Sequence, residues 1–406
     1  MHRRRLLQVV LASAVAGTAG RHANASGLKV VVAGAGIVGA SIAYHLSKAG
    51  ASVTVIDKQG PASHASRGSF AWINATWAKQ PRYYHSLSQA SVTYWKELSD
   101  SLSIPVHWGG SLEWYTDAAR QDTLVEQIAE QAEWGERARM VKAAELAEME
   151  PGVNFGDIRH AAYSGNDGGV DSIAATQALL KAAEALGATQ HYPCELNDTV
   201  LQNGKLVAVE TSLGAIETDR LVLATGAAAD AGRRFAGCDI PQRSTPGVIV
   251  ITEPMERVLN GVLSAPGVHM HQRSDGRIVL GEQDGAPDTE AHATRLSGRP
   301  NDYPSRALAL EHANRILAVA RTFVPATADA VVDKVYIGWR PLPLDGHPVL
   351  GASPARPDVY LAIMHSGVSL APIVGQLVSA ELGNPSFADQ LQHFRPDRKF
   401  DLIKRY

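Results

Sequence analysis

Short runs of aliphatic and β-branched residues alternate along the chain with stretches in which apolar residues recur every three or four positions. The run from Leu28 to Ala33 carries one polar side chain, which predicts a strand buried on both faces. Residues 40–49 have helical spacing, Gly50 is placed to end that helix, and residues 51–57 predict a second strand. Strand, helix and strand in this order indicate one unit of a parallel sheet.

The same pattern predicts further elements across the rest of the chain. Helices are expected at 84–102, 120–148, 178–186 and 305–323, and strands at 110–115, 221–226, 248–252 and 277–281. Asn203-Gly204 is a strong signal for a hairpin turn between two short strands. The tail at 359–382 predicts a strand, a loop and a helix. No internal repeat is present, so the sequence indicates an α/β fold whose domains are interleaved along the chain.

Residues 1–25 differ in composition from everything that follows. Arg3-Arg4-Arg5 precedes Leu6-Leu7 and a stretch of small apolar residues, and Ala23-Asn24-Ala25 fits an A-x-A cleavage site. This order predicts a signal peptide of the twin-arginine type and a periplasmic protein. The alternatives are a basic N-terminus that is not a signal, with a cytoplasmic protein, or a single membrane anchor. No later run is apolar for long enough to span a membrane, so no stable span is expected in the mature chain.

Composition narrows the class of protein. The chain has 406 residues, 45% of them hydrophobic and 19% charged, which is ordinary for a folded protein of two or three domains. A net charge of −3 gives no basic footprint, so nucleic acid is not an expected partner. Cys194 and Cys238 lie far apart in sequence, which favours two buried free thiols, although export would permit one disulfide.

The strongest local motif is the glycine pattern between the first strand and the first helix. Gly34 permits a tight turn, Gly36 lets the backbone approach a pyrophosphate, and Gly39 allows the helix to pack closely on the strand. The phosphates would bind at the helix N-terminus, where unpaired N–H groups favour anions. Asp57 follows Gly34 by 23 residues, near the spacing of an acid that binds a ribose 2′-hydroxyl. The motif therefore predicts FAD or NAD rather than NADP.

Several separate stretches then indicate a family. The first unit at 28–57, Ala224-Thr225-Gly226, the stretch from Gly338 to Gly351 and the stretch from Met364 to Pro372 occur in the order found in one group of flavoproteins. Together they resemble the D-amino-acid oxidase, glycine oxidase and sarcosine oxidase family. The resemblance implies a Rossmann-like FAD-binding domain of the glutathione-reductase type, with an interleaved substrate domain built on an antiparallel sheet.

The resemblance also implies a division of the chain and a set of cofactor residues. The FAD-binding domain is expected at 28–80, 151–240 and 331–406, and the substrate domain at 81–150 and 241–330. The positions carried over to FAD binding are Gly34, Gly36, Ile37, Val38, Gly39, Asp57, Lys58, Ser66, Arg67, Gly68, Thr225, Gly226, Gly367, Val368 and Ser369. For Arg67 the alternative is an ordinary solvated loop arginine.

Two departures from the family pattern bear on the flavin. The segment from His365 to Pro372 is two residues shorter than the family's G-H-S-G-T-G-x-x-L-A-P. No cysteine occurs at 335–351, where sarcosine oxidases attach flavin covalently, so FAD is expected to bind without a covalent link. A histidyl link through His64 is the weaker alternative.

Arg340 is the residue most informative about substrate. It matches the family's x-L-R-P arginine, whose planar fork suits a substrate carboxylate beside the flavin; the alternative is an arginine paired with a structural acid. Trp339 and His365 are expected next to it in the catalytic site. The arginine that some members carry three residues later is Pro343 here, which makes D-amino-acid oxidase itself a poorer match.

No metal site is expected. His269 and His271 would point to one face of a strand, but no third ligand accompanies them at usable spacing, and a pocket-lining or surface role is favoured.

The expected function is oxidation of an amine or amino acid at its C–N bond. Hydride transfer to flavin N5 would give an imine that hydrolyses to an oxo acid or aldehyde, with oxygen or a quinone as electron acceptor. Two alternatives remain: a dehydrogenase of 2-hydroxy acids or N-methyl amines, and a non-catalytic flavin-binding protein that serves in electron transfer or maturation of a partner.

Overall fold

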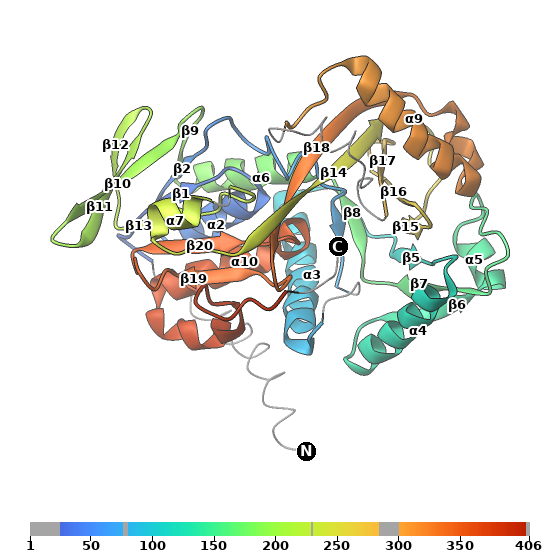
Figure 1. The fold of residues 1–406 in the computed structure, drawn as a ribbon, viewed down its shortest axis with the longest axis horizontal. Coiled ribbons are helices and arrows are strands. Elements are labelled where there is room, and N and C mark those ends of the chain that lie inside the picture. Colours follow the sequence, from blue (N-terminus) through green and yellow to red (C-terminus); the bar gives the residue numbers. More distant parts are fainter. Residues whose placement is uncertain (1–24, 76–79, 229, 284–299, 403–406) are drawn as a thin grey trace.

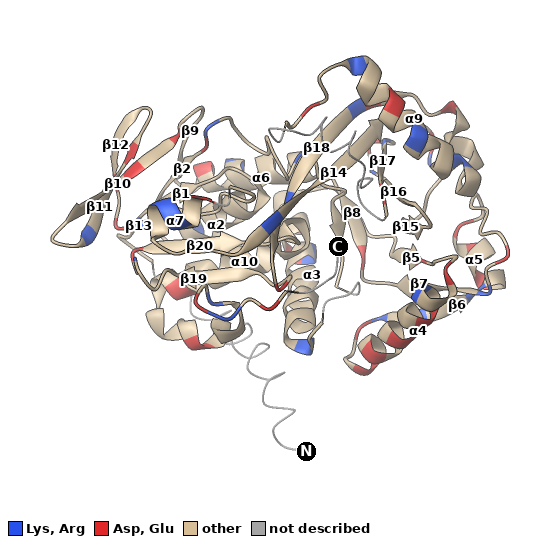
Figure 2. Cartoon of the chain, viewed as in Figure 1, with Lys and Arg blue, Asp and Glu red and all other residues tan. Residues whose placement is uncertain are grey.

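The computed structural model describes residues 25–75, 80–228, 230–283 and 300–402, so most of the predicted signal peptide lies outside the described residues. Two large sheets lie side by side, one on each side of Figure 1, and the long strands β14 and β18 of the second sheet extend toward the first. Acidic and basic residues are mixed over the elements of both parts (Figure 2). Among the described residues, no helix has the length and apolar character that crossing a bilayer requires.

The first sheet has six strands and is parallel apart from one edge. Its order is β19 (Val349–Ala352), β20 (Val359–Ile363), β13 (Arg220–Leu223), β1 (Lys29–Ala33), β2 (Ser52–Ile56) and β9 (Thr189–His191), with β19 antiparallel to β20. Val31 and Val32 of β1 are both almost fully buried, because each face of the sheet is covered. The sequence prediction of a doubly covered parallel strand is confirmed at β1.

Helices and a small sheet form the layers on either side. Helix α2 (Ile37–Lys48) packs against both α6 (Ser172–Ala185) and α10 (Gly367–Gly383), and α3 (Arg82–Leu102) packs on α10. Val30 and Val32 share a hydrophobic core with residues of these helices, whereas Val31 and Ala33 share a second core with α7 (Asp230–Ala236). Part of a three-stranded sheet, β10 (Leu196–Gln202), β11 (Lys205–Thr211) and β12 (Gly214–Glu217), joins that second core. The predicted Asn203-Gly204 turn joins β10 and β11, and both turn residues have positive φ.

The second sheet has eight strands. Its order is β18 (Val332–Pro343), β14 (Gln242–Thr252), β17 (Ile278–Gly281), β16 (Val268–Gln272), β15 (Val262–Ala265), β5 (Ser111–Glu113), β7 (His160–Ser164) and β6 (Ala138–Lys142). Every neighbouring pair is antiparallel except β15 and β5, so the expected antiparallel sheet is mixed at that one pair. Helix α9 (Arg306–Phe323) buries Ile316 and Leu317 against one face, which we call the outer face. Two 3₁₀ helices lie at Pro325–Asp329 and Pro385–Phe394.

The predicted helix at 120–148 is wrong in its middle. Helix α4 (Ala118–Glu133) begins at Asp117, whose carboxylate accepts a hydrogen bond from the Arg120 N–H (2.9 Å). Gly135 then adopts φ +91°, β6 pairs with β7, and a separate helix α5 (Ala143–Met149) follows. The helical spacing of this stretch is therefore overridden by the pairing of β6 with β7, which is distant in sequence.

Sheet membership divides the chain differently from the predicted domain boundaries at three places. Strand β7 falls within the range expected for FAD binding, and so does all of β18, yet both belong to the eight-stranded sheet. Helix α3 falls within the range expected for the substrate domain but packs on α10, where Trp95 Nε1 donates to the Val368 carbonyl (2.8 Å). A small sheet combines β3 (Trp72–Ile73) and β8 (Gly168–Val170), from the ranges expected for FAD binding, with β4 (Val106–His107), from the range expected for the substrate domain.

Candidate cofactor and substrate site

A cavity of about 530 Å³ opens where β1, β2 and β13 end. Its walls come from segments that are far apart in sequence. Thirteen residues predicted for the site line it: Gly34, Gly36, Ile37, Val38, Asp57, Lys58, Ser66, Thr225, Gly226, Trp339, His365, Gly367 and Val368. The carboxyl edge of a parallel sheet is where such folds bind dinucleotides.

The glycine motif has the geometry that its sequence predicts. Gly34 has φ +117°, and a Cβ there would lie 2.3 Å from the Ala224 carbonyl oxygen, so no other residue fits this turn. A Cβ on Gly39 would lie 1.9 Å from the Gly34 carbonyl oxygen. Gly39 therefore allows the close packing of α2 on the turn and does not itself line the cavity.

The start of α2 lies at the cavity wall. The N-cap residue is Gly36, which has no side chain to cap the helix. The Ile37 N–H donates a hydrogen bond to Ser66 Oγ (2.9 Å). A helix N-terminus with a hydroxyl beside it is a ready site for phosphate oxygens. Ser66 thus lies where the pyrophosphate of a dinucleotide would bind.

Asp57 and Thr225 supply polar atoms on the same wall. Asp57 Oδ2 accepts from the Ala35 N–H (2.9 Å), and Oδ1 accepts from the N–H groups of Gln59 (2.8 Å) and Gly60 (3.0 Å). These bonds fix the carboxylate at the end of β2. Thr225 Oγ1 is buried and finds no hydrogen-bond partner among the described residues. A glycine turn, a helix N-terminus, a fixed carboxylate and an unsatisfied hydroxyl together fit an adenine dinucleotide.

The other part of the lining comes from β18 and the segments near it. Trp339 and Pro341 line the cavity, and Trp339 Nε1 donates to the Pro300 carbonyl (3.0 Å). His64 lines it too, and its ring hydrogen-bonds with Asn301. Met364 and His365, which follow β20, complete this part. Aromatic and apolar groups with few polar atoms suit the ring system of a redox cofactor.

Three residues predicted to contact the cofactor instead hold separate segments of the molecule together. Arg67 binds the Asp302 carboxylate (3.0 and 3.1 Å) and lies over the Tyr336 ring (4.6 Å to the centroid). A Cβ on Gly68 would lie 2.4 Å from the Gly338 backbone, so two main chains meet there. Ser369 Oγ donates to the Trp72 carbonyl (2.9 Å). None of the three lines the cavity.

Arg340 lies on β18 between two cavity-lining residues but is not itself in the lining. Neighbouring residues of a strand point to opposite faces, so Arg340 faces away from Trp339 and Pro341. Its guanidinium lies over β14, where a Cβ on Gly247 would be 3.0 Å from Nη2. Burial raises the pKa of Glu282, and the positive charges of Arg315 and Arg340 act in the opposite direction.

Two aromatic rings lie beside the histidines of β16. Phe70 lies 5.4 Å from His269 and 4.9 Å from His271, centroid to centroid, and Trp72 lies 5.9 Å from His269. His271 Nε2 hydrogen-bonds with the Phe70 carbonyl (2.9 Å), and burial lowers its pKa to about 4. Within the described ranges, no three His, Cys, Asp or Glu side chains gather as a metal ion would require.

Part of the lining carries no sequence motif that could have indicated it. Cys194, Glu195 and Leu196 border the cavity at the start of β10, and Asp230 and Arg234 border it from α7. They lie together because segments that are far apart in the sequence meet at the same edge of the six-stranded sheet. Cys194 is buried and Cys238 is partly exposed, and both are free thiols.

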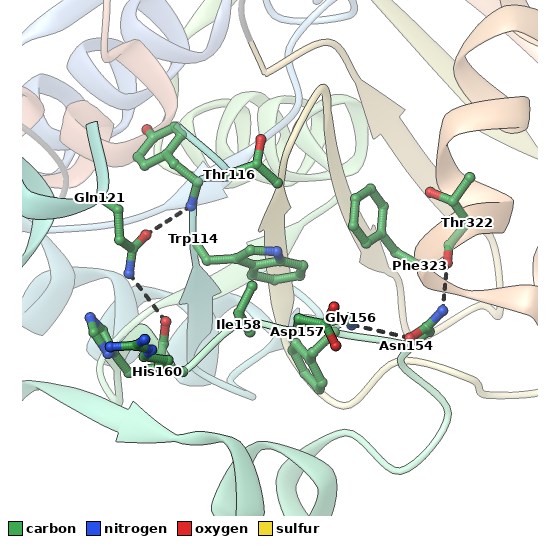
Figure 3. Close-up of a pocket in the computed structure, with 13 residues that line it drawn as sticks. Trp114, Thr116, Gln121, Asn154, Gly156, Asp157, Ile158, His160, Thr322 and Phe323 are labelled. Carbon is green, nitrogen blue, oxygen red and sulfur yellow. Dashed lines mark hydrogen bonds between the residues drawn. The ribbon is translucent and has the colours of Figure 1, made fainter. Parts of the chain in front are cut away.

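A second cavity, of about 450 Å³, lies where residues 154–160 meet the end of α9 (Figure 3). The buried Trp114 ring forms part of its wall, with Phe155 and Phe323 beside it. These rings belong to the core under the outer face of the large sheet. No residue of the glycine motif, and neither Trp339 nor His365, borders this cavity.

Comparison with known proteins agrees with the geometry of the first cavity. A family model described as FAD dependent oxidoreductase matches residues 29–381. The chain belongs to this family. It is therefore an enzyme that uses FAD. The residues of the dinucleotide cavity fit this cofactor, so we call it the FAD cavity.

Relatives of similar length are distant in sequence. Glycine oxidase from Bacillus licheniformis is 25% identical over 380 residues, which is 91% of this chain and 97% of the relative. An opine oxidase chain from Agrobacterium tumefaciens is 26% identical over 384 residues, with the same shares of 91% and 97%. The solved structure of glycine oxidase from Geobacillus kaustophilus has the same fold, with a TM-score of 0.80 at 24% identity over 92% of this chain and all of that one.

Proposed function

We propose that this enzyme oxidises the C–N bond of a small amino acid or related amine that carries a carboxylate. The observation that carries the proposal is the position of Arg340 on β18. Its neighbours Trp339 and Pro341 line the FAD cavity, and its guanidinium lies over Gly247 on the opposite face of the strand. A guanidinium fork there can hold a carboxylate by two parallel hydrogen bonds. The names of the relatives, glycine oxidase and opine oxidase, support a substrate of this kind.

The chain's own residues then act by orientation. Arg340 would fix the carboxylate, so that the neighbouring carbon and its amine are presented in one pose. Trp339 and His365 line the FAD cavity and would border the substrate there. FAD, when bound, supplies the two-electron oxidation, and the resulting imine hydrolyses in water to an oxo acid or aldehyde. A substrate that arrives with a neutral amine needs no protein base.

The test is a set of reductions without oxygen. The purified protein would be loaded with FAD and mixed anaerobically with glycine, sarcosine, D-alanine and L-proline, and the visible flavin band followed. Bleaching by at least one of these and not by 2-hydroxy acids supports the proposal. Bleaching by hydroxy acids alone, or by none of the panel, contradicts it. Reoxidation by air or by an added quinone then identifies the class of electron acceptor.

Export is a separate part of the proposal and rests on the first 25 residues. Arg3-Arg4 would direct the folded, FAD-loaded protein through the twin-arginine route to the periplasm. Replacing both arginines with lysine should leave the protein in the cytoplasmic fraction. N-terminal sequencing of the exported protein tests cleavage at Ala25. In the structure of the full chain this residue is 3% exposed, and its N–H donates a hydrogen bond to the Ala49 carbonyl (3.1 Å).

A further inference from the structure

The first part of β14 carries a group of buried polar atoms without partners. Both amide atoms of Gln242, the hydroxyl of Ser244 and the hydroxyl of Thr245 are inaccessible and make no hydrogen bond with any described residue. Folded proteins leave few such atoms, because each loses its hydrogen bonds to water and gains nothing in return. A buried hydroxyl of this kind is a position where a bound molecule would supply the missing partner.

Of these three residues, only Thr245 shares a face with Arg340. Thr245 lies directly opposite Arg340 in the antiparallel pairing of β14 with β18. Directly opposed side chains lie on the same face, about 5 Å apart at Cβ. Gln242 and Ser244 are an odd number of positions from Thr245 along the strand, so they point to the other face.

The guanidinium of Arg340 packs against a glycine on this same face. Gly247, two positions from Thr245, lies on this face, and a Cβ there would be 3.0 Å from Arg340 Nη2 and 3.1 Å from Nε. The missing side chain lets the guanidinium lie flat on β14. Thr245 and Arg340 are therefore neighbours on one face of the sheet, the first with a single hydroxyl and the second with several N–H donors.

We propose that Thr245 is a second binding group for the substrate carboxylate. Its hydroxyl donates a hydrogen bond to one carboxylate oxygen, while Arg340 holds the carboxylate through its fork. A carboxylate accepts about four hydrogen bonds, so the bidentate arginine leaves a lone pair for the threonine. This assignment rests on the proposed function, because it presupposes that Arg340 binds a carboxylate.

The test compares two near-isosteric changes on adjacent residues. Thr245→Val removes the hydroxyl and keeps the branched shape, and Ser244→Ala removes a hydroxyl from the opposite face. Each FAD-loaded variant is titrated with acetate, a carboxylate that is not oxidised, and binding is followed through the visible flavin spectrum. Thr245→Val should weaken acetate binding about tenfold, as expected for one hydrogen bond to a charged group, and Ser244→Ala should not change it.

Two further measurements separate a binding role from a structural one. Thr245→Ser should restore most of the acetate affinity, and the FAD dissociation constant should be the same in all variants. For an amino acid substrate, Thr245→Val should raise KM with little change in kcat, because the lost bond holds the substrate before and during reaction. Should Thr245→Val fail to fold, Thr245→Ala provides the same comparison.

The outcomes also separate this inference from the proposed function. If the wild type binds acetate and Arg340→Ala abolishes that binding while Thr245→Val leaves it unchanged, the role of Thr245 is wrong and that of Arg340 stands. If neither substitution changes acetate binding, or the wild type binds no acetate, the carboxylate site itself is wrong.

Discussion

At the scale of single residues, the direction of a side chain decides its role. Trp339 and Arg340 are neighbours on β18, yet Trp339 lines the FAD cavity and Arg340 faces β14. Arg67 follows β2 in the sequence, but its side chain binds Asp302 and lies over the Tyr336 ring and does not line the cavity. A motif match therefore predicts where a residue lies in the fold. Only its contacts show whether its side chain lines the cavity or binds another segment of the protein.

Replacing Arg340 tests the carboxylate anchor directly. Arg340→Ala should lower kcat/KM for an amino acid substrate by the equivalent of about 2–5 kcal/mol, because a charge-assisted pair is lost. FAD binding should be retained, since Arg340 does not line the FAD cavity. Steady-state kinetics and the flavin spectrum measure both effects. Unchanged kinetics on every carboxylate substrate would show that Arg340 has another role.

Glu113 makes the stability depend on pH. It is buried on β5, accepts a hydrogen bond from Tyr115 Oη (2.7 Å), and burial raises its pKa from 4.5 to about 7. Between pH 4.5 and 7 the unfolded chain loses this proton and the folded chain keeps it. The contribution of Glu113 to the free energy of unfolding therefore falls as pH rises through this range, by about 3 kcal/mol in full.

Glu113→Gln should remove that contribution, because the carboxamide stays neutral at every pH. The difference in unfolding free energy between Glu113→Gln and wild type should shift in favour of the variant from pH 4.5 to 8. Urea unfolding at several pH values measures it. Parallel pH profiles for the two proteins would contradict the assignment.

At the scale of elements, α2 makes one contact at its N-terminus and another along its length. Its N-terminus meets the cavity through Gly36 and Ile37, and its body packs on α10 at Gly375. A Cβ on Gly375 would lie 2.4 Å from His45 Nδ1 and 2.7 Å from the Ser41 carbonyl oxygen. The two helices approach this closely because the residue between them has no side chain. The placement of the phosphate-binding end thus depends on a glycine that is far from it in the sequence.

Gly375→Ala should force α2 and α10 apart. The expected loss is about 1–3 kcal/mol of unfolding free energy, the usual cost of overpacking. Gly152→Ala is the matched control, because a Cβ there meets only the Val258 carbonyl oxygen at 3.6 Å and φ is ordinary. Thermal unfolding compares the two, and equal melting temperatures would contradict the prediction.

At the scale of the whole molecule, the FAD cavity depends on contact between the two large sheets. Gly34 and Asp57 come from the six-stranded part, and Trp339 and Pro341 come from an edge strand of the eight-stranded sheet. The main chains of the two parts meet at Gly68 and Gly338. That contact lies two residues from Arg340, so it helps set the distance between substrate anchor and cofactor.

Gly68→Ala should disturb this closure. Its Cβ would meet the Gly338 backbone at 2.4 Å, and no flexible side chain there can give way. We expect weaker FAD binding and a lower melting temperature, with Gly152→Ala again as control. FAD affinity is measured by the quenching of flavin fluorescence on binding. A Gly68→Ala variant that binds FAD as tightly as wild type would show that the contact does not position the cavity.

The sequence alone determined the first βαβ unit, because its strand, turn, helix and acid are contiguous and each is specified by local chemistry. The turn at Gly34 and the carboxylate of Asp57 are placed as the motif predicts. The resemblance of separate stretches also predicted the family, and the match over residues 29–381 confirms it.

Only the tertiary structure decided which distant segments complete the site. Strand β6 interrupts a predicted helix because it pairs with β7, and Cys194, Asp230 and Asn301 reach the cavity from segments with no motif. It likewise placed Ser369 and Gly68 at contacts between distant segments, and Thr245 opposite Arg340. Local sequence specifies backbone conformation and periodicity, whereas these positions depend on strand register and on the packing of residues far apart in the chain.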